Sequence, residues 1–262
     1  MQAPQLPRFV LPPLWREAAV ALEAAGLVRD PIFREGPGLD GNGQAVLLVP
    51  GFLAGDGSLG VMTTWLRKAG FRTKRAGIRF NVACSGEATT AMEERLEAHA
   101  ERHGPVIVIG QSRGGHFARA LAVRRPDLVR GIVTLGTPML DPFAVHPLVL
   151  AQVGLVGALG TLGVGGLFRH MCLAGACCEA FRETMTAPIP DEVGYVSVYS
   201  RNDGIVDWRV CLDPAADDLV EVDASHCGMA LHAGTYRAVA GALAGFEGRH
   251  QVAAFPPLAQ AA

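Results

Sequence analysis

The sequence has no long run of charge of either sign. Its 23 Lys and Arg residues nearly balance its 25 Asp and Glu residues, and the formal net charge is −2. Proteins that bind nucleic acids or anionic membranes through charge carry clustered basic residues. We therefore expect no nucleic-acid partner, and the even mixture of signs also argues against a polybasic membrane anchor.

The first residues lack the features of a secretory signal. Residues 1–8 read MQAPQLPR, without a basic region followed by an unbroken apolar stretch and a small-residue cleavage site. We therefore expect a cytoplasmic protein, with attachment to the periphery of a membrane as the alternative location.

Paired cysteines are absent as well. His170-Met171-Cys172 and Cys177-Cys178 come nearest to a metal-binding pattern, but no second ligand pair of suitable spacing accompanies them. The cysteines, none in C-x-x-C spacing, are Cys84, Cys172, Cys177, Cys178, Cys211 and Cys227. The spacing therefore predicts free thiols in a reducing compartment and no metal site.

Apolar residues are plentiful, and their periodicity alternates along the chain. Half of the 262 residues are hydrophobic, which is enough for a sizeable core in a single domain of residues 1–262. Short apolar runs predict buried strands at 45–49, 106–109 and 131–135, and further strands are predicted at 71–76, 194–199 and 217–222. Helical spacing occurs at 14–26, 59–69, 88–102, 116–125 and 229–246. This alternation predicts an α/β protein with a mostly parallel central sheet and flanking helices.

The most informative stretch lies between Pro105 and Gly115. The apolar run Val106–Ile109 leads directly into Gly110-Gln-Ser-Arg-Gly114, and a helical segment follows. Strand, G-x-S-x-G and helix in this order are typical of a nucleophile elbow, a sharp turn that exposes the serine hydroxyl. We predict that Ser112 is a nucleophile. The backbone N–H of Arg113, at the start of the helix, is a predicted oxyanion donor.

A second loop follows the first predicted strand. Residues 50–55 read PGFLAG, a small glycine-bearing loop that can aim a backbone N–H group at a reaction centre. We predict that the N–H of Phe52 completes an oxyanion hole with that of Arg113, and Leu53 is the alternative donor.

Two later strand ends supply an acid and a base for the serine. Asp203 follows the strand at 194–199, and His226 follows the next strand. A serine hydroxyl needs a base to take its proton, and a third group orients that base. We predict His226 as the general base and Asp203 as its partner. Asp207 is the alternative acid. We expect His116 to form a polar wall of the site and His232 to lie within the final helix.

A long insertion separates the elbow region from these strand ends. Residues 142–168 contain no Asp, Glu, Lys or Arg, and regular alternation resumes only at Gly194. An apolar insertion of this kind at about 139–192 is predicted to be a lid. The glycines 154, 157, 160, 163, 165 and 166 weaken any single rigid helix there. A membrane span would disrupt the strand and helix alternation, so we expect contact with a lipid interface instead.

From about Val46 to Phe246, the sequence resembles the α/β-hydrolases, and among them the lipases and carboxylesterases. The resemblance is carried by VPGF at 49–52, GQSRG at 110–114, LGTP at 135–138, NDGIV at 202–206 and SHCG at 225–228. The order Ser112, Asp203, His226 is also the order of that family. Two residues depart from this resemblance: Arg113 stands where many lipases have a smaller or different residue, and Pro50 stands where histidine is frequent. Neither departure removes a predicted oxyanion donor, because both donors are backbone N–H groups.

This resemblance implies hydrolysis of apolar carboxylic esters, of a small-molecule or lipid kind, through an acyl-serine and without a cofactor. We predict that Leu53, Gln111 and Met139 contact the substrate. The sequence leaves three alternatives open: an acyltransferase, a thioesterase with the same triad, or a non-catalytic membrane-associated scaffold of the same fold. It does not indicate an oligomeric state.

Overall fold

Parallel strands form one sheet at the centre of the molecule. The computed structural model describes residues 11–253, and within them a six-stranded sheet has the order β2-β1-β3-β4-β5-β6, with every neighbouring pair parallel. The strands are β1 Ala45–Val49, β2 Arg72–Arg75, β3 Val106–Gln111, β4 Val129–Leu135, β5 Gly194–Tyr199 and β6 Asp218–Glu221. This arrangement confirms the predicted α/β class and the mostly parallel sheet.

The residue types follow each strand's place in the sheet. Every residue of the inner strands β1 and β3 is buried, as their uninterrupted apolar runs predict. The edge strands differ: β2 reads RTKR and is largely exposed, and β6 begins with Asp218 and ends with Glu221. Charged edge strands resist pairing with other chains.

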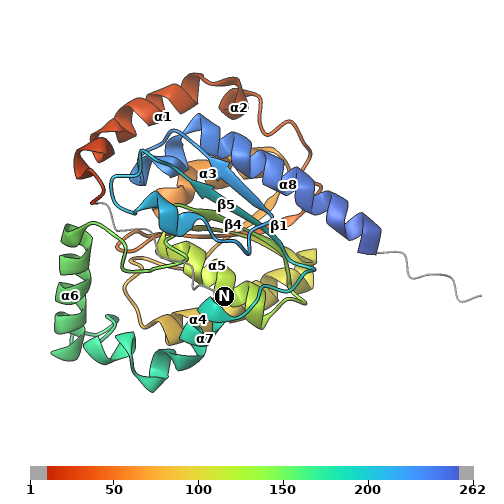
Figure 1. Ribbon diagram of the computed structural model, residues 1–262. Coiled ribbons are helices and arrows are strands. Elements are labelled where there is room, and N and C mark those ends of the chain that lie inside the picture. The colour runs from red at the N-terminus through yellow and green to blue at the C-terminus, as the bar shows by residue number, and fades with distance from the viewer. Residues whose placement is uncertain (1–10, 254–262) are drawn as a thin grey trace, which may run out of the picture.

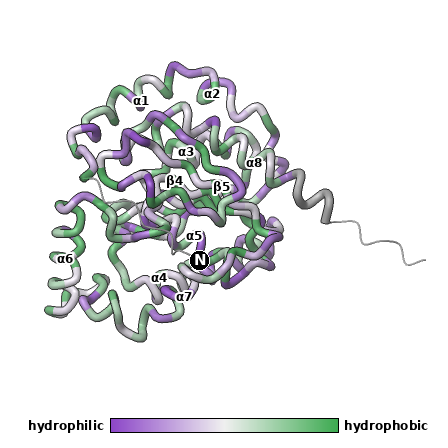
Figure 2. The backbone as a smooth tube through the Cα atoms, in the orientation of Figure 1, coloured by the Kyte–Doolittle hydropathy of each residue, from purple (hydrophilic) through white to green (hydrophobic). Residues whose placement is uncertain are grey.

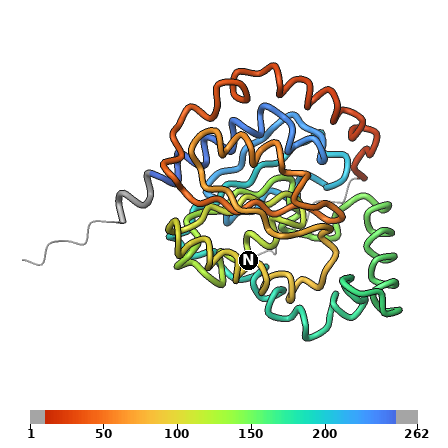
Figure 3. Tube along the Cα trace, turned by 180° about the vertical axis from the view of Figure 1, so that it is seen from behind, coloured from red at the N-terminus to blue at the C-terminus, as the bar shows by residue number. Residues whose placement is uncertain are grey.

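Helices cover both faces of the sheet (Figure 1). One face carries α1 Val20–Arg29, α2 Pro31–Arg34, α3 Gly60–Lys68 and α8 Ala233–Ala253. The other carries α4 Ser85–His103, α5 Arg113–Arg124 and α7 Glu179–Thr186. Short 3-10 helices are η1 Leu14–Ala19, η2 Asp56–Leu59, η3 His170–Leu173, η4 Ala176–Cys178, η5 Trp208–Cys211 and η6 Cys227–Leu231. From behind, the N-terminal helices lie over α8 (Figure 3).

Helix α6, Pro147–Thr161, corrects one prediction. The glycines of this segment were expected to weaken any single helix, yet 15 residues form a continuous one. A Cβ at Gly157 would lie 3.3 Å from the Phe168 ring, and one at Gly160 would meet the Phe168 carbonyl oxygen. These glycines therefore let the returning chain pack closely against α6, and that packing offsets their poor helix propensity.

Two other boundaries differ from the sequence predictions. The last helix begins at Ala233 rather than at Met229, because residues Cys227–Leu231 form the 3-10 turn η6 first. His232 therefore precedes the final helix instead of lying within it.

Helix α7 belongs to the layer of α4 and α5, where Phe181 contacts Phe117 of α5 with ring centroids 5.5 Å apart. Helix α7 therefore packs against α5 and α4, in the part of the chain between β4 and β5.

Helix α6 stands at one side of the molecule, at the left of Figure 1. Most of its length has hydrophobic colours in Figure 2, and its outward leucines include Leu148 and Leu155, which are 56% and 59% exposed. No helix within residues 11–253 is long and apolar enough to cross a bilayer.

Candidate active site

Ser112 lies on a strained turn between β3 and α5. Its φ of 51° is in the left-handed region, which non-glycine residues seldom adopt. A Cβ at Gly110 would collide with the Gly114 carbonyl, and a Cβ at Gly114 would collide with the Val49 carbonyl. Both glycines are therefore required by the close approach of backbone, and the turn has the form that the G-x-S-x-G pattern predicts.

Asp203 and His226 form a buried hydrogen-bonded pair. The Nδ1 atom of His226 lies 2.6 Å from Oδ2 of Asp203, and these residues are 6% and 3% exposed. The other carboxylate oxygen, Oδ1, accepts hydrogen bonds from the N–H groups of Ile205 and Val206, at 2.8 and 2.6 Å. Both oxygens of the carboxylate are therefore held by hydrogen bonds. Because Nδ1 of the imidazole is bonded to Asp203, Nε2 is the ring nitrogen that is left for other partners.

Opposing effects act on the pKa of His226. Burial is the largest effect and lowers the pKa, but the charge of Asp203, the hydrogen bond to Asp203 and the charge of Glu17 together outweigh it. The pKa is therefore raised above the ordinary value of 6.5. An imidazole with a raised pKa is neutral at a pH above that raised pKa, and it holds a proton well enough to donate it afterwards.

Asp207, the alternative acid, has other partners. Its carboxylate accepts a hydrogen bond from the Arg209 N–H at the start of η5 and forms an ion pair with the Arg209 guanidinium at 3.1 Å. These are the contacts of a residue that caps a helix start and forms a salt bridge. The geometry thus favours Asp203 as the partner of His226.

The turn that carries Ser112 also touches the loop that carries His226. The side-chain amide of Gln111 donates to the His226 carbonyl at 3.0 Å. Gly136, at the end of β4, lies where a Cβ would be 3.1 Å from Nδ1 of His226. Among the described residues, no hydrogen bond joins the Ser112 hydroxyl to the imidazole. Such bonds are often long in proteins without bound substrate and tighten when substrate arrives.

Arg113 anchors the start of α5 through its side chain. Its guanidinium donates to the carbonyls of Asn81 and Ala83 and to the hydroxyl of Ser85, at 2.7, 2.7 and 3.0 Å. Burial lowers the pKa of Arg113 to about 10, so the group stays charged near neutral pH. Asn81 also donates to the Pro50 carbonyl at 2.8 Å. This network joins the two loops that carry the predicted oxyanion donors.

In comparisons of sequence, no model of a known protein family and no curated protein matches this chain significantly. Comparisons of structure give clear similarities. The mature lipase of Bacillus licheniformis has a TM-score of 0.59 at 16% identity, over 78% of this chain and 94% of that one. A metagenomic carboxyl esterase has a TM-score of 0.56 at 16% identity, over 83% and 78%. An alpha/beta hydrolase from a lagoon-sediment metagenome has a TM-score of 0.53 at 17% identity, over 81% and 94%.

The chain has the α/β-hydrolase fold. In this fold the carboxyl ends of the parallel strands meet at one edge, where open α/β sheets place their sites. Here that edge brings together the loops after β1, β3, β5 and β6, which carry Phe52, Ser112, Asp203 and His226. The four loops therefore lie at the edge of the sheet where the expected fold places them.

Within this α/β-hydrolase fold, an apolar pocket of about 270 Å³ opens beside Ser112. Phe52, Met139 and Phe168 line it, along with residues of α6 and α7. Of the side chains predicted to contact substrate, only Met139 is part of the lining. Gln111 is instead bonded to the His226 carbonyl, and Leu53 is 41% exposed with a φ of 59°.

His116 forms part of the pocket wall, as its alternative interpretation proposed. Its Nε2 atom lies 3.1 Å from the Pro138 carbonyl oxygen, and burial lowers its pKa to about 4. The ring is therefore neutral at physiological pH. A neutral, hydrogen-bonded imidazole presents an almost apolar face to the pocket.

The N-terminal helices supply contacts that the sequence did not reveal. Glu17 accepts hydrogen bonds from the N–H groups of Gly204, His226 and Cys227, at 2.9, 2.9 and 2.8 Å. Glu23 accepts from both the N–H and the hydroxyl of Ser225. The helical spacing at 14–26 indicated only a helix here, because the partners of these carboxylates lie far away along the chain. These contacts hold the loop after Asp203 and the loop of His226 in place.

Four of the six cysteines, which are spread along the sequence, lie together in space. The ligand atoms of Cys84, Cys172, Cys177 and Cys178 all lie within 4.8 Å of one another. Three of these residues come from the insertion and the fourth precedes α4. Spacing along the sequence could not show this, because 88 positions separate Cys84 from Cys172.

Proposed function

We propose that this protein is a serine ester hydrolase that cleaves esters with apolar acyl groups. The observation that carries the proposal is the buried Asp203–His226 pair, at the same sheet edge as the strained Ser112 turn and its apolar pocket. The similarity of the fold to a lipase and to a carboxyl esterase is consistent with this function, although fold alone does not fix an activity.

In the proposed reaction, the Ser112 hydroxyl attacks the ester carbonyl while Nε2 of His226 takes the hydroxyl proton. Asp203 stabilises the imidazolium that forms. The backbone N–H of Arg113, together with that of Phe52 or Leu53, donates to the carbonyl oxygen as it becomes negative. The tetrahedral intermediate then expels the alcohol, which takes the proton from His226.

The second half of the reaction restores the enzyme. Water attacks the acyl-serine as His226 takes one of its protons, and the collapse of the second intermediate releases the acid and reprotonates Ser112. The apolar lining that includes Met139 and Phe168 would hold the acyl chain and exclude water, which strengthens the oxyanion interactions.

We further propose that the insertion at about 139–192 is a lid whose outer surface meets lipid. Val156 and Phe168 pack with Phe52 beneath α6, so the insertion contacts the predicted oxyanion loop directly. Its outer leucines are exposed, with no charged residue between 142 and 168. An apolar, uncharged surface next to the pocket suits an enzyme that takes substrate from an interface.

Hydrolysis of p-nitrophenyl esters from acetyl to palmitoyl tests this function, with Ser112→Ala as the blank. We expect Ser112-dependent turnover that persists or rises with chain length. A maximum at the shortest esters would contradict the preference for long acyl chains but would still support esterase activity. If no ester gives a rate above that of Ser112→Ala, the hydrolase proposal is wrong.

A further inference from the structure

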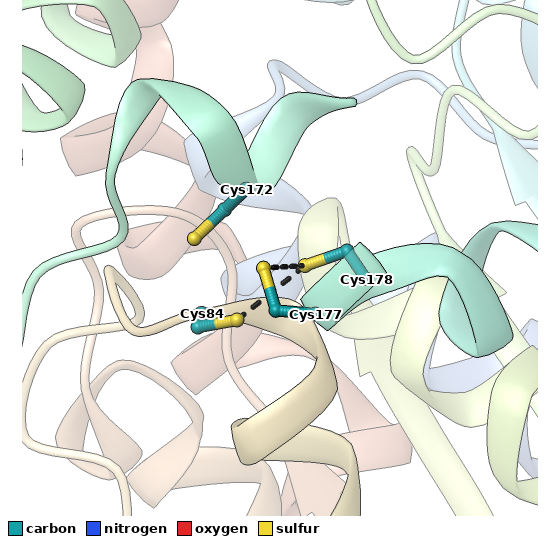
Figure 4. Close-up of side chains that lie close together, drawn as sticks. All are labelled: Cys84, Cys172, Cys177 and Cys178. Carbon is teal, nitrogen blue, oxygen red and sulfur yellow. Dashed lines mark hydrogen bonds between the residues drawn. The ribbon is translucent and has the colours of Figure 1, made fainter. Parts of the chain in front are cut away.

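Four cysteine sulfurs converge beside the pocket, which two of these cysteines, Cys172 and Cys178, help to line. Figure 4 shows the side chains of Cys84, Cys172, Cys177 and Cys178 directed toward one common point. The sulfur of Cys84 lies 3.4 Å from that of Cys178, and the sulfurs of Cys177 and Cys178 are 4.0 Å apart. All four lie within 4.8 Å of one another.

These separations fit four ligands around a single ion. A Zn–S bond of about 2.3 Å places the sulfurs of a tetrahedral site about 3.8 Å apart. The observed separations of 3.4 and 4.0 Å lie on either side of this value. An iron–sulfur cluster holds its thiolates around a body of several metal and sulfide atoms, so its cysteines must stand farther apart.

The surroundings of the sulfurs suit thiolates. Cys84 is the residue before the first turn of α4, a 19-residue helix whose free N–H groups and positive dipole end favour negative charge. The backbone N–H of Arg169 points to the sulfur of Cys172 at 3.4 Å. The guanidinium of Arg113 lies close by, since it donates to Ala83 and Ser85 on either side of Cys84. N–H groups and a cation around a thiolate set are what an anionic tetrathiolate site requires.

The backbone also favours a preformed site. A Cβ at Gly86 would collide with the carbonyl oxygen of Cys177, so glycine is needed for η4 to approach the start of α4 this closely. Cys84 and Cys178 are buried, whereas Cys177 is exposed. The site therefore has two ligands fixed in the interior and one open side through which an ion can enter.

We propose that Cys84, Cys172, Cys177 and Cys178 bind one Zn²⁺ ion at a structural site. Four thiolates in tetrahedral arrangement select zinc among the abundant divalent ions, and four protein ligands leave no open position for chemistry. The ion joins η3 and η4 of the insertion to the start of α4.

This site would fix one wall of the pocket. Cys172 and Cys178 are among the residues that line it, and Arg182, which also lines it, donates to the carbonyls of Ala174 and Gly175 between η3 and η4. None of the residues of η3 is buried, so little apolar packing would hold it against the body of the protein without the ion. Zinc binding thus adds to the stability of the segment between α6 and α7.

Metal analysis of the full-length protein, purified without chelator from cells grown with zinc, tests the proposal directly. We expect one zinc per chain. Cys84→Ser and the exposed Cys177→Ser should each lose most of the bound metal, and Cys177→Ser keeps the test valid if the buried substitution prevents folding. Cys227→Ser, which removes an exposed thiol outside the cluster, should retain one zinc per chain.

Cobalt gives a second readout that does not depend on ester hydrolysis. Refilling the metal-free protein with Co²⁺ should produce the strong visible bands of a tetrahedral tetrathiolate complex, and Cys177→Ser should weaken and shift them. Three results would overturn the proposal: native protein without metal, a cobalt spectrum of an octahedral site, or a mass that is lower by the hydrogens of a disulfide within the cluster. The proposed esterase activity can fail independently of all three.

Discussion

The carboxylate of Glu17 accepts a hydrogen bond from the backbone N–H of His226, at 2.9 Å, across 209 positions of the sequence. The same carboxylate binds the N–H of Gly204, the residue after Asp203. An N-terminal 3-10 helix therefore holds together the loops of the proposed acid and base. Its negative charge also contributes to the raised pKa of His226.

We expect Glu17→Gln to lower kcat/KM by about tenfold, or ~1.4 kcal/mol of transition-state stabilisation. Glutamine keeps an acceptor but loses the charge, so the pKa of His226 should fall and the acidic limb of the rate profile should move to lower pH. Glu35→Gln, an exposed residue of the same N-terminal region, is the matched control. An unchanged pH profile for Glu17→Gln would show that the charge of Glu17 does not act on His226, and an unchanged kcat/KM would show that Glu17 has no positioning role.

The pH dependence of the native protein follows from the same pair. The proposed base must be neutral to take a proton, so kcat/KM should rise with pH through the pKa of His226. Since that pKa is raised, the midpoint should lie above 6.5. The effect of pH on stability runs in the opposite direction. Because the pKa is raised in the folded protein, protonated His226 stabilises the fold at low pH, and this contribution is lost as the pH rises through the raised pKa. A midpoint below 6.5 would contradict this account of the site.

Substitution of the two candidate acids separates their roles. Asp203→Asn should lower kcat by about 10³- to 10⁴-fold, because the amide favours the wrong imidazole tautomer and does not stabilise the imidazolium. Asp207→Asn should cost only ~1 kcal/mol of stability through its cap and its pair with Arg209, with activity reduced far less. Steady-state kinetics with thermal melting distinguish the two. The reverse order of effects on kcat would assign the acid to Asp207.

The outer surface of α6 makes a prediction about substrate form. Leu155→Glu places a charge on a residue that is 59% exposed, so the fold should tolerate it. We expect hydrolysis of emulsified long-chain esters to fall several-fold, while hydrolysis of soluble short esters stays within about twofold. Leu22→Glu on α1, where the leucine is 77% exposed, is the control outside the insertion. Equal losses on both substrate forms would show that α6 does not meet the interface.

Local sequence patterns predicted most of the strands and the turn around Ser112. The strand before Gly110, the crowding that requires glycine and the helix after Arg113 are all fixed within a few residues, so the pattern specifies the geometry. The placement of Asp203 and His226 after later strands follows from the same logic, because parallel strands bring their carboxyl ends to one edge.

Contacts between distant segments could not be predicted in this way. Glu17 looks like an ordinary charged residue of an amphipathic helix until its partners at Gly204 and His226 are known. The continuous helix α6 depends on the packing of Phe168 against Gly160, and the cysteine cluster depends on Gly86 admitting the carbonyl of Cys177. In each case the decisive partner lies in another part of the chain, where periodicity and spacing carry no information.

The most direct test of the proposed activity is covalent labelling by a fluorophosphonate probe, followed by mass spectrometry of the labelled peptide. The probe reacts only with a serine whose hydroxyl is activated by a base. We predict that folded native protein is labelled at Ser112, and that Ser112→Ala and Asp203→Asn lose the label nearly completely. Folded native protein that remains unlabelled, or is labelled equally in Ser112→Ala, would contradict the proposal that Ser112 is a catalytic nucleophile.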